Sequence, residues 1–171
     1  RYEWKQYRHK VISGIFSARR RIGKTAPIFP GDARQLWDGP SARWDLETGT
    51  AGIILALSRL GVDTHELAVE LAGNMCTTDL SEEGLLRGLP GIALAMAEAG
   101  QPEIALALAG HRKSFASKNA NIRSGVAGTV LSYLSLCQYG IKIRFIHELL
   151  ADFEDALEGS DIYVDGGGAE T

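Results

Sequence analysis

GTAGIILAL (residues 49–57), GLPGIALAM (88–96) and GVAGTVLSY (125–133) share one pattern, in which two glycines three residues apart precede an apolar run. Aligned on the first glycine, the stretches match at both glycines and at a leucine three residues after the second. They begin 39 and 37 residues apart. Such a period is typical of proteins in which one helical unit stacks on the next. The pattern therefore predicts three copies of one structural unit.

Pro90 indicates where these stretches become helical. A proline fits only in the first turn of a helix, where its missing N–H would have no acceptor anyway. The pattern thus predicts helix starts near Leu89 and, by alignment, near Thr50 and Val126. A hydroxyl residue precedes the first glycine in two units, and we expect it to cap the helix there. These predicted caps are Thr48 and Ser124.

A second type of helix alternates with the glycine-led helices. It is predicted to be amphipathic, with apolar residues at helical spacing on one side and charged residues on the other. The expected ranges are 64–75, 102–118 and 142–159. The positions expected to be buried are Leu67, Ala68, Leu71 and Met75 in the first, Ile104, Leu108 and Phe115 in the second, and Ile146, Leu149, Leu150, Phe153 and Leu157 in the third.

The glycine-led helices have almost no polar side. In residues 52–60, only Ser58 and Arg59 interrupt the apolar run. A helix that is apolar all round must be buried all round. Each unit is therefore predicted to pair an inner, buried helix with an outer, half-exposed one. Such hairpins stack either as an open superhelix or as a closed ring.

Two explanations fit the glycine pairs. Glycine removes bulk where close-set inner helices converge at their N-terminal ends. Alternatively, it lets an anionic ligand reach the free N–H groups and the positive end of a helix. We favour packing. Replacing Gly91 by valine discriminates between them, because weaker ligand binding at an unchanged melting temperature would contradict the packing explanation.

The composition fits one globular domain: 171 residues, of which 45% are hydrophobic. No apolar run is long enough to cross a bilayer and no signal-peptide pattern is present, so we expect no membrane partner. Two cysteines are too few for a disulfide scaffold, which favours a reducing, cytoplasmic location. The chain begins with Arg and ends GGGAET without a closing element. We therefore expect it to be a piece of a longer protein.

Residues 1–47 do not repeat and are typical of a linker. Within them, residues 1–24 hold eight Lys or Arg and one Glu, although the whole chain has a net charge of −3. Such a block could hold phosphate or nucleic acid, but no nucleic-acid fold signature accompanies it. We expect a solvated face or a strip that docks on an acidic neighbouring domain, and no nucleic-acid partner. Helices are expected over 2–16 and, after Pro30-Gly31, over 33–37.

No complete active site is present in the sequence. Cys76 and Cys137 lie in different units without a nearby histidine, so we expect buried thiols rather than zinc ligands. VDGGGAE (164–170) lacks the Lys-Ser/Thr of a phosphate-binding loop, and no kinase catalytic loop or nucleophile elbow occurs. We therefore assign no catalytic, cofactor-binding or metal-ligating residue. The histidines expected at the surface are His9, His65, His111 and His147.

Residues 14–61 resemble the junction between the kinase domain and the C-terminal cyclase-like domain of class III and class IV lanthionine synthetases. In that family a Gly-Ile-x-x-Ala segment and a Phe-Pro-Gly-Asp turn precede the first glycine-led helix. The two later stretches are similar to the next repeats, so the resemblance covers about residues 12–171. The matching residues at the junction are Gly14, Ile15, Ala18, Phe29, Pro30, Gly31, Asp32, Gly49, Ala51, Gly52 and Ile53.

The resemblance implies a domain organisation and a fold class. Residues 1–47 would be the linker from a preceding kinase-like domain. Residues 48–171 would be the N-terminal half of the cyclase domain, with repeats at about 48–86, 87–123 and 124–165. The implied fold is all-α: an α/α toroid, in which helical hairpins form a double ring, here an incomplete ring of about three hairpins.

The resemblance also implies a function. Such synthetases phosphorylate Ser and Thr of a precursor peptide, eliminate the phosphate, and add Cys thiols to the double bonds, which forms thioether (lanthionine) rings. The addition needs a thiolate, whereas a free thiol has a pKa of about 8.5, and zinc-using members lower that pKa by coordinating the sulfur. The implied partners are the precursor peptide and the rest of the parent synthetase.

The implied cofactors belong to the parent protein. They are ATP with Mg²⁺ in its kinase domain and, if the parent is class IV rather than class III, zinc in its cyclase domain. The family's zinc ligands would follow residue 171, and its kinase and lyase residues would precede Arg1. No site residue of the family is therefore carried over to this chain.

Two other functions stay open. The toroid could be a non-catalytic module that docks the peptide for an attached protein kinase domain. It could also belong to a carbohydrate-active enzyme, which would need paired carboxylates facing the cavity, whereas Glu98 is the one carboxylate expected on an inner helix. Half a ring would expose two apolar seams, so residues 1–171 alone are expected to aggregate or self-associate.

Overall fold

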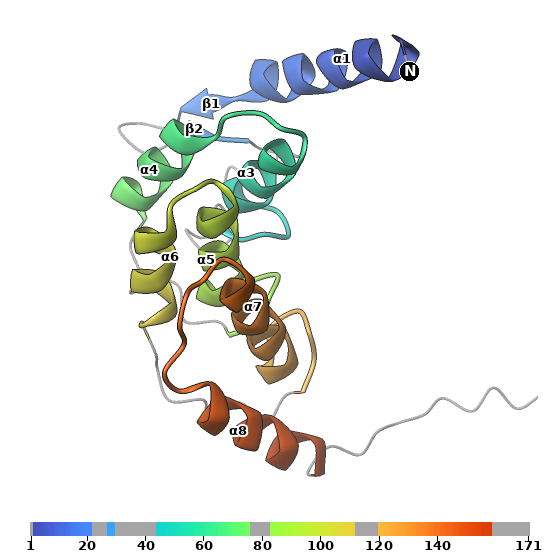
Figure 1. The fold of residues 1–171 in the computed structure, drawn as a ribbon. Coiled ribbons are helices and arrows are strands. Elements are labelled where there is room, and N and C mark those ends of the chain that lie inside the picture. The colour runs from blue at the N-terminus through green and yellow to red at the C-terminus, as the bar shows by residue number, and fades with distance from the viewer. Residues whose placement is uncertain (1, 22–26, 30–43, 76–82, 112–119, 159–171) are drawn as a thin grey trace, which may run out of the picture.

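The computed structural model describes residues 2–21, 27–29, 44–75, 83–111 and 120–158 (Figure 1). The predicted helix over 33–37 and the predictions for Cys76, Phe115 and residues 164–170 lie outside this part of the chain. The described residues are all-α, as predicted, apart from two antiparallel two-residue strands, β1 (Arg20–Arg21) and β2 (Pro27–Ile28). The helices are α1 (Tyr2–Ala18), α3 (Thr50–Arg59), α4 (His65–Asn74), α5 (Leu89–Glu98), α6 (Pro102–Ala109), α7 (Val126–Gln138) and α8 (Ile146–Glu158). None of these helices is both long and apolar enough to cross a bilayer.

The three glycine-led helices begin where the sequence predicts. α3, α5 and α7 start at Thr50, Leu89 and Val126, and Pro90 lies in the first turn of α5. The three helices lie side by side: α5 contacts α3 on one side and α7 on the other. Each also contacts the helix that follows it in the chain, which gives the pairs α3 and α4, α5 and α6, and α7 and α8. Figure 1 shows α3, α5 and α7 following one another down the molecule, with α1 across one end and α8 across the other.

The predicted caps Thr48 and Ser124 are wrong. The N-cap residue of each inner helix is the first glycine of its pair, so no N-cap side chain accepts from the first N–H groups of the helix. Instead, in the first and third units, a side chain four residues before that glycine bonds the backbone of the preceding loop, whereas the second unit has Gly84 at this position. Asp45 Oδ1 accepts from the N–H groups of Thr48 at 2.8 Å and Gly49 at 2.9 Å, and Asn121 Oδ1 accepts from that of Ser124 at 2.8 Å. Asp and Asn side chains favour such turns because they reach the backbone a few residues further on.

A glycine with positive φ lies two residues after the end of each inner helix. These are Gly61 (φ 72°), Gly100 (φ 74°) and Gly140 (φ 76°). The glycine N–H bonds the carbonyl three residues earlier, and the next N–H bonds the carbonyl five residues earlier, as in a Schellman motif. Glycine suits this left-handed conformation because it has no Cβ. The unit therefore has a third recurring glycine, which follows the end of the apolar run.

Complete burial of the inner helices holds for α5 but not for α3 or α7. Residues Leu89–Ala97 of α5 are all buried. On α7, Leu131 is 45% exposed and Leu134 is 47% exposed, whereas their counterparts on α5, Leu94 and Ala97, are 7% and 6% exposed. Ala56 of α3 is exposed as well. The prediction that each such helix is buried all round is therefore wrong for α3 and α7. The reason is tertiary: α5 lies between two inner helices, whereas α3 and α7 each pack mainly against α5 among the described helices.

The outer helices differ from their predicted lengths. α4 buries Leu67, Ala68 and Leu71, as predicted. α6 ends at Ala109, because Gly110 forms its C-cap, and does not continue to the predicted residue 118. α8 starts at Ile146 rather than 142, because Ile141 and Ile143 are buried from a non-helical segment that precedes it. Of the five positions predicted to be buried on α8, Leu149 is buried, Leu157 is exposed, and the others are partly buried: Ile146, Leu150 and Phe153.

α1 packs on the first helical pair through one of its sides. It is two residues longer than the predicted helix over 2–16. The Arg8 Nε donates to Leu60 O at 2.8 Å, beyond the end of α3, and the Arg19 Nη2 lies 2.8 Å from Glu70 Oε2 on α4. Trp4 and Tyr7 are exposed. Part of the basic block thus binds within the chain itself.

Candidate functional site

The loops before α3, α5 and α7 form a hydrogen-bonded stack at the N-terminal ends of these helices. We call residues 45–48, 84–87 and 121–124 the loop stack. Backbone N–H groups of each loop donate to carbonyl groups of the next loop, so the three units are joined in order. The bonds are Leu46 and Glu47 to Leu86 O (2.9 and 3.1 Å), Leu85 to Ile122 O (3.0 Å), and Leu86 and Arg87 to Arg123 O (3.1 and 3.2 Å).

The second glycine of each pair lies directly against the loop stack. A Cβ at that position would meet the carbonyl oxygen of the residue six positions earlier, which belongs to the loop of the same unit. The Cβ would lie 2.2 Å from Leu46 O at Gly52, 1.7 Å from Leu85 O at Gly91 and 1.8 Å from Ile122 O at Gly128. Packing thus explains these glycines. The expected partner was wrong, however: the nearest atoms belong to the unit's own loop and, at Gly91 and Gly128, also to the loop of the preceding unit, not to a converging inner helix.

Glu47 joins all three loops through its side chain. Its Oε2 accepts from Arg87 Nε at 2.8 Å and from Arg123 Nε at 2.9 Å. The hydrogen bonds from these two guanidinium groups lower the pKa of Glu47. The bridge therefore connects the loops of all three units beside the N-terminal ends of their inner helices.

Asp45 is a buried carboxylate in the first loop, with 3% of its surface exposed. Burial raises its pKa above the usual value, and the hydrogen bonds from the Thr48 and Gly49 N–H groups partly oppose this. Among the described residues, its hydrogen bonds all go to the turn that leads into α3. We therefore assign Asp45 a structural role.

A second polar bridge joins the C-terminal ends of the inner helices. The Tyr139 hydroxyl donates to Glu98 Oε2, and Arg59 Nε lies 3.7 Å from Glu98 Oε1. The hydrogen bond to Glu98, together with burial, raises the pKa of Tyr139. Glu98 thus links the ends of α3, α5 and α7, and among the described residues it is not paired with a second carboxylate there.

One interaction between carboxylates occurs elsewhere. Glu83, just before the second loop, has its pKa raised mainly by burial and also by the negative charge of Asp152 on α8. Its Oε2 is buried and has no hydrogen-bond partner among the residues that the structure describes. Glu83 and Asp152 lie outside the inner helices, so they do not match the arrangement expected for a carbohydrate-active toroid.

The residues singled out from the sequence do not form a site. Cys137 is exposed as a free thiol, so its predicted burial is wrong; it lies near the end of α7, which has an uncovered side. All four histidines are exposed, as predicted. Within the described ranges, no three Cys, His, Asp or Glu side chains lie close enough together to hold a metal ion.

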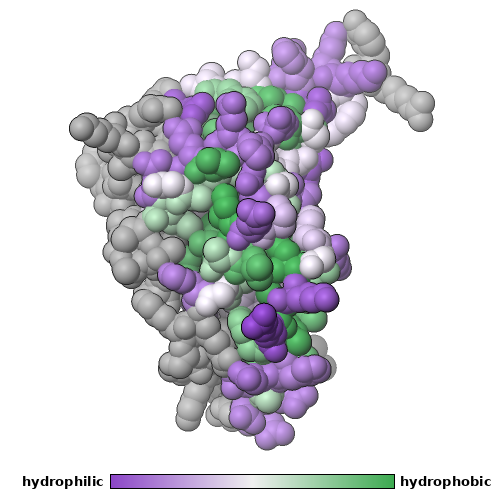
Figure 2. Space-filling view, turned by 60° about the vertical axis from the view of Figure 1, so that its left-hand side comes forward, coloured by the Kyte–Doolittle hydropathy of each residue, from purple (hydrophilic) through white to green (hydrophobic). Residues whose placement is uncertain are grey.

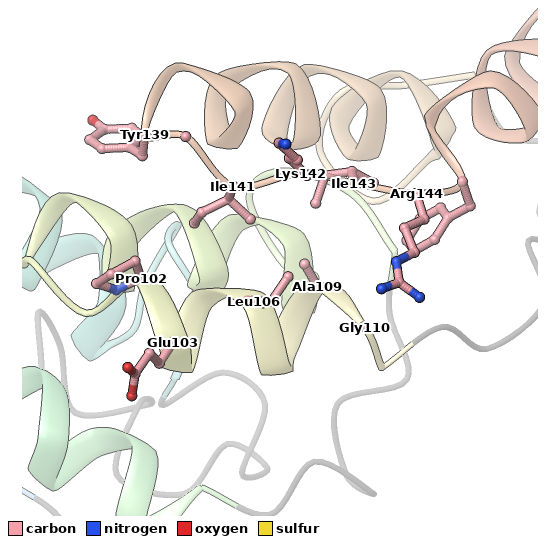
Figure 3. Close-up of a pocket in the computed structure, with 12 residues that line it drawn as sticks. Pro102, Glu103, Leu106, Ala109, Gly110, Tyr139, Ile141, Lys142, Ile143 and Arg144 are labelled. Atoms are coloured by element: carbon pink, nitrogen blue, oxygen red, sulfur yellow. The ribbon is translucent and has the colours of Figure 1, made fainter.

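A groove lies between α6 and residues 139–145, and we call it the α6 groove. Its volume is about 630 Å³. α6 contributes Pro102, Leu106 and Ala109, and the opposite wall includes Ile141 and Ile143 (Figure 3). Leu106 is 50% exposed. The charged residues that line the groove are Glu103, Lys142 and Arg144.

The same apolar character is visible on the surface. Figure 2, in which the side of α4 and α6 comes forward, shows hydrophobic residues along the middle of this face and hydrophilic residues beside them. The exposed large apolar residues of these two helices are Val69 and Leu106. The sequence does carry a signal for this surface: EIALALAG (103–110) has no polar residue between Glu103 and Gly110, so α6 has no fully polar outer side. The opposite wall comes from the next unit and could not be found from spacing.

No family model, no curated protein and no solved structure matches this chain. A function must therefore be inferred from the molecule itself. The features available for that purpose are the three stacked units, the uncovered side of α7 and the α6 groove.

Proposed function

We propose that this chain is part of the cyclase-like domain of a lanthipeptide synthetase, a protein that modifies Ser, Thr and Cys residues of a precursor peptide. The observation that carries the proposal is the threefold recurrence of one unit, in which a loop, a glycine pair and an inner helix keep the same register. The same glycine-led helices after a Phe-Pro-Gly-Asp segment are the basis of the resemblance to this family. The parent would belong to class III or class IV.

In this proposal the units continue into an α/α toroid beyond α7. The uncovered side of α7, with Leu131 and Leu134, supports it, because an inner helix covers the corresponding residues of α5. The loop stack supports it as well. The N–H groups of Leu46 and Leu85 each donate to the next loop, whereas that of Ile122, their counterpart, has no backbone acceptor among the described residues. A further unit of the same kind would supply both the missing helix and the missing carbonyl group.

We expect residues 1–171 to self-associate in isolation, because soluble monomers rarely tolerate a large exposed apolar patch. The double variant Leu131→Lys/Leu134→Lys should give a monomer, because two charges on this side of α7 cannot be buried against a second chain. Size-exclusion chromatography with light scattering measures the change. Val69→Lys on α4 is the matched control, since it adds a charge at a similarly exposed apolar position. A monomeric parent chain, or equal effects of the control, would contradict the proposed edge.

The chemistry proposed for the parent is the addition of a Cys thiol to a dehydrated Ser or Thr. Zinc, in a class IV parent, would lower the pKa of that thiol by coordinating it. No residue of this chain is assigned to the chemical step. The contribution of this chain would be to build one side of the ring and to hold peptide.

The groove favours a second function, in which the toroid docks the precursor peptide for an attached kinase domain and performs no cyclisation. The two functions differ in their products. We would co-express the complete protein with Ser-, Thr- and Cys-containing peptides encoded beside it, and analyse the peptides by mass spectrometry after thiol alkylation. Dehydrated peptides whose thiols no longer react support the synthetase with cyclase activity. Dehydrated peptides with fully reactive thiols support docking alone, and unmodified peptides contradict both.

A further inference from the structure

We propose that the α6 groove binds a short extended peptide segment that carries apolar side chains and, toward one end, a carboxylate. This inference rests on the proposed function only for the source of the peptide, which would be the precursor peptide. Three properties of the groove walls select this ligand: an exposed apolar floor, a cation without a partner among the described residues, and unpaired backbone groups along one wall.

The apolar floor is suited to side chains rather than to a polar small molecule. Leu106 is a large residue that stays half exposed on a helix otherwise packed against α5. Pro102 and Ala109 extend the same side of α6 in both directions. Burial of such surface stabilises a complex by roughly 25 cal/mol per Å² of apolar area removed from water. Two apolar side chains of a ligand could pack against this apolar surface, between α6 and residues 139–145.

The charges of the groove are separated along its length. Figure 3 shows Glu103 toward one end of α6 and Arg144 toward the other, near Gly110. No ion pair or side-chain hydrogen bond of Arg144 or Lys142 is found in the described parts of the chain. The other arginines whose side chains are placed all bind within the chain: Arg8, Arg19, Arg59, Arg87 and Arg123. Arg144 is thus available for a ligand carboxylate, which it can bind with two parallel hydrogen bonds.

The wall opposite α6 favours an extended ligand. Ile141 and Ile143 are buried while Lys142 and Arg144 are exposed, which is the alternation of an extended chain. Among the described residues, the N–H groups of Lys142 and Ile143 have no backbone acceptor, and because successive N–H groups of an extended chain point to opposite edges, one of the two can pair with a ligand. Extended peptides commonly bind by pairing with such groups. From Glu103 to Gly110 the helix rises about 10 Å, which three to four extended residues span.

The test uses two fluorescein-labelled tetrapeptides and the full chain, with affinity measured by fluorescence anisotropy. One peptide has two leucines followed by two aspartates, and the other has lysines in place of the aspartates. We expect the acidic peptide to bind more tightly, and its affinity to fall with added salt. Arg144→Glu should weaken its binding about tenfold, because an attraction becomes a repulsion. Leu106→Gln should weaken the binding of both peptides.

Two control variants keep the test specific. Lys10→Glu makes the same kind of charge change on exposed α1, and Val69→Gln makes the same kind of polarity change on exposed α4. Neither should alter binding. Equal affinity of Arg144→Glu and the parent chain for the acidic peptide, or equal losses in the controls, would overturn the proposal. So would an Arg144-dependent affinity for anionic vesicles that equals the affinity for the peptide.

This test and the test of the proposed function can fail separately. Arg144-dependent peptide binding without dehydrated products in the co-expression experiment would keep the groove as a peptide site and reject the synthetase. Thioether formation by an Arg144→Glu protein at the parent's rate, together with unchanged peptide affinity, would keep the synthetase and reject the groove.

Discussion

Replacing Gly128 by alanine is expected to destabilise the folded chain by about 3 kcal/mol or more. The new methyl group would lie 1.8 Å from Ile122 O and 2.4 Å from the Leu85 nitrogen. These two atoms are the acceptor and the donor of one bond of the loop stack, 3.0 Å apart. Overpacking alone costs roughly 1–3 kcal/mol, and loss of the hydrogen bond between Leu85 and Ile122 adds roughly 0.5–1.5 kcal/mol. No rotamer can relieve the clash, since all the atoms involved belong to the backbone.

Gly73→Ala is the matched control for this substitution. Gly73 lies on α4, and a Cβ there would meet nothing within 4 Å. Alanine is the better helix former, so a gain of up to about 1 kcal/mol is expected. Denaturant unfolding of both variants gives the comparison, provided that the slopes with denaturant agree.

The same measurement decides between the two explanations of the glycine pairs. Gly91→Val should act in the same direction as Gly128→Ala, because its Cβ would lie 1.7 Å from Leu85 O. A variant at either position that melts like the parent chain but has lost affinity for a ligand would contradict packing. It would then favour approach of a ligand to the helix N-terminal ends.

Asp45→Ala is expected to cost about 2–3 kcal/mol, the second largest effect. Its carboxylate accepts hydrogen bonds from two N–H groups of the turn before α3, and the site is almost completely buried. Alanine would leave both N–H groups without an acceptor, and each such buried group costs about 1–3 kcal/mol, less where water enters. Asp45→Asn is the matched control, because Asn121 performs the equivalent task in the third unit. A similar loss for both variants would contradict a role as acceptor.

Asp45 and Glu47 should change the free energy of unfolding in opposite directions as the pH changes. Burial raises the folded-state pKa of Asp45 above 3.8, so its ionised form opposes folding above that pKa, and the penalty disappears as the pH falls toward 3.8. The arginines lower the folded-state pKa of Glu47 below 4.5, so its contribution is present above pH 4.5 and is lost as the pH falls through the folded-state value. As the pH falls, the free energy of unfolding of the parent chain should therefore rise relative to that of Asp45→Asn. It should fall relative to that of Glu47→Gln. Parallel pH profiles of the three proteins would contradict these assignments. The Glu47 effect should be about 1 kcal/mol or less, since the bridge is partly exposed to solvent.

The starts of the inner helices could be predicted from the sequence because local signals determine them. Pro90 allows one position in a helix, and alignment on the glycines transferred that start to Thr50 and Val126. The loop contacts of the second glycines were not predictable. They depend on how a loop folds back over six residues, which spacing alone does not reveal.

The errors in the outer helices and in burial have tertiary causes. Residues 142–145 fit a helical pattern as well as the alternating one that the structure has, and packing of Ile143 selects the latter. Leu131, Leu134 and Cys137 are apolar or weakly polar residues on an apolar helix, and the residue pattern alone does not show which side of that helix is exposed. The α6 groove was missed for the same reason, because its walls belong to different units.

The loop stack also determines how the three units are energetically coupled. Among the described residues, each loop bonds mainly its immediate neighbour and each inner helix packs mainly on the adjacent one. Coupling between the first and third units therefore runs mainly through the second, although Glu47 also bonds Arg123 directly. The free energy of unfolding should therefore approach the sum of the stabilities of the single units and of the interfaces between neighbouring units. Disruption of α3 is expected to affect mainly the first unit, whereas disruption of α5 would remove the main packing between the first and third units and leave the direct bond from Arg123 to Glu47.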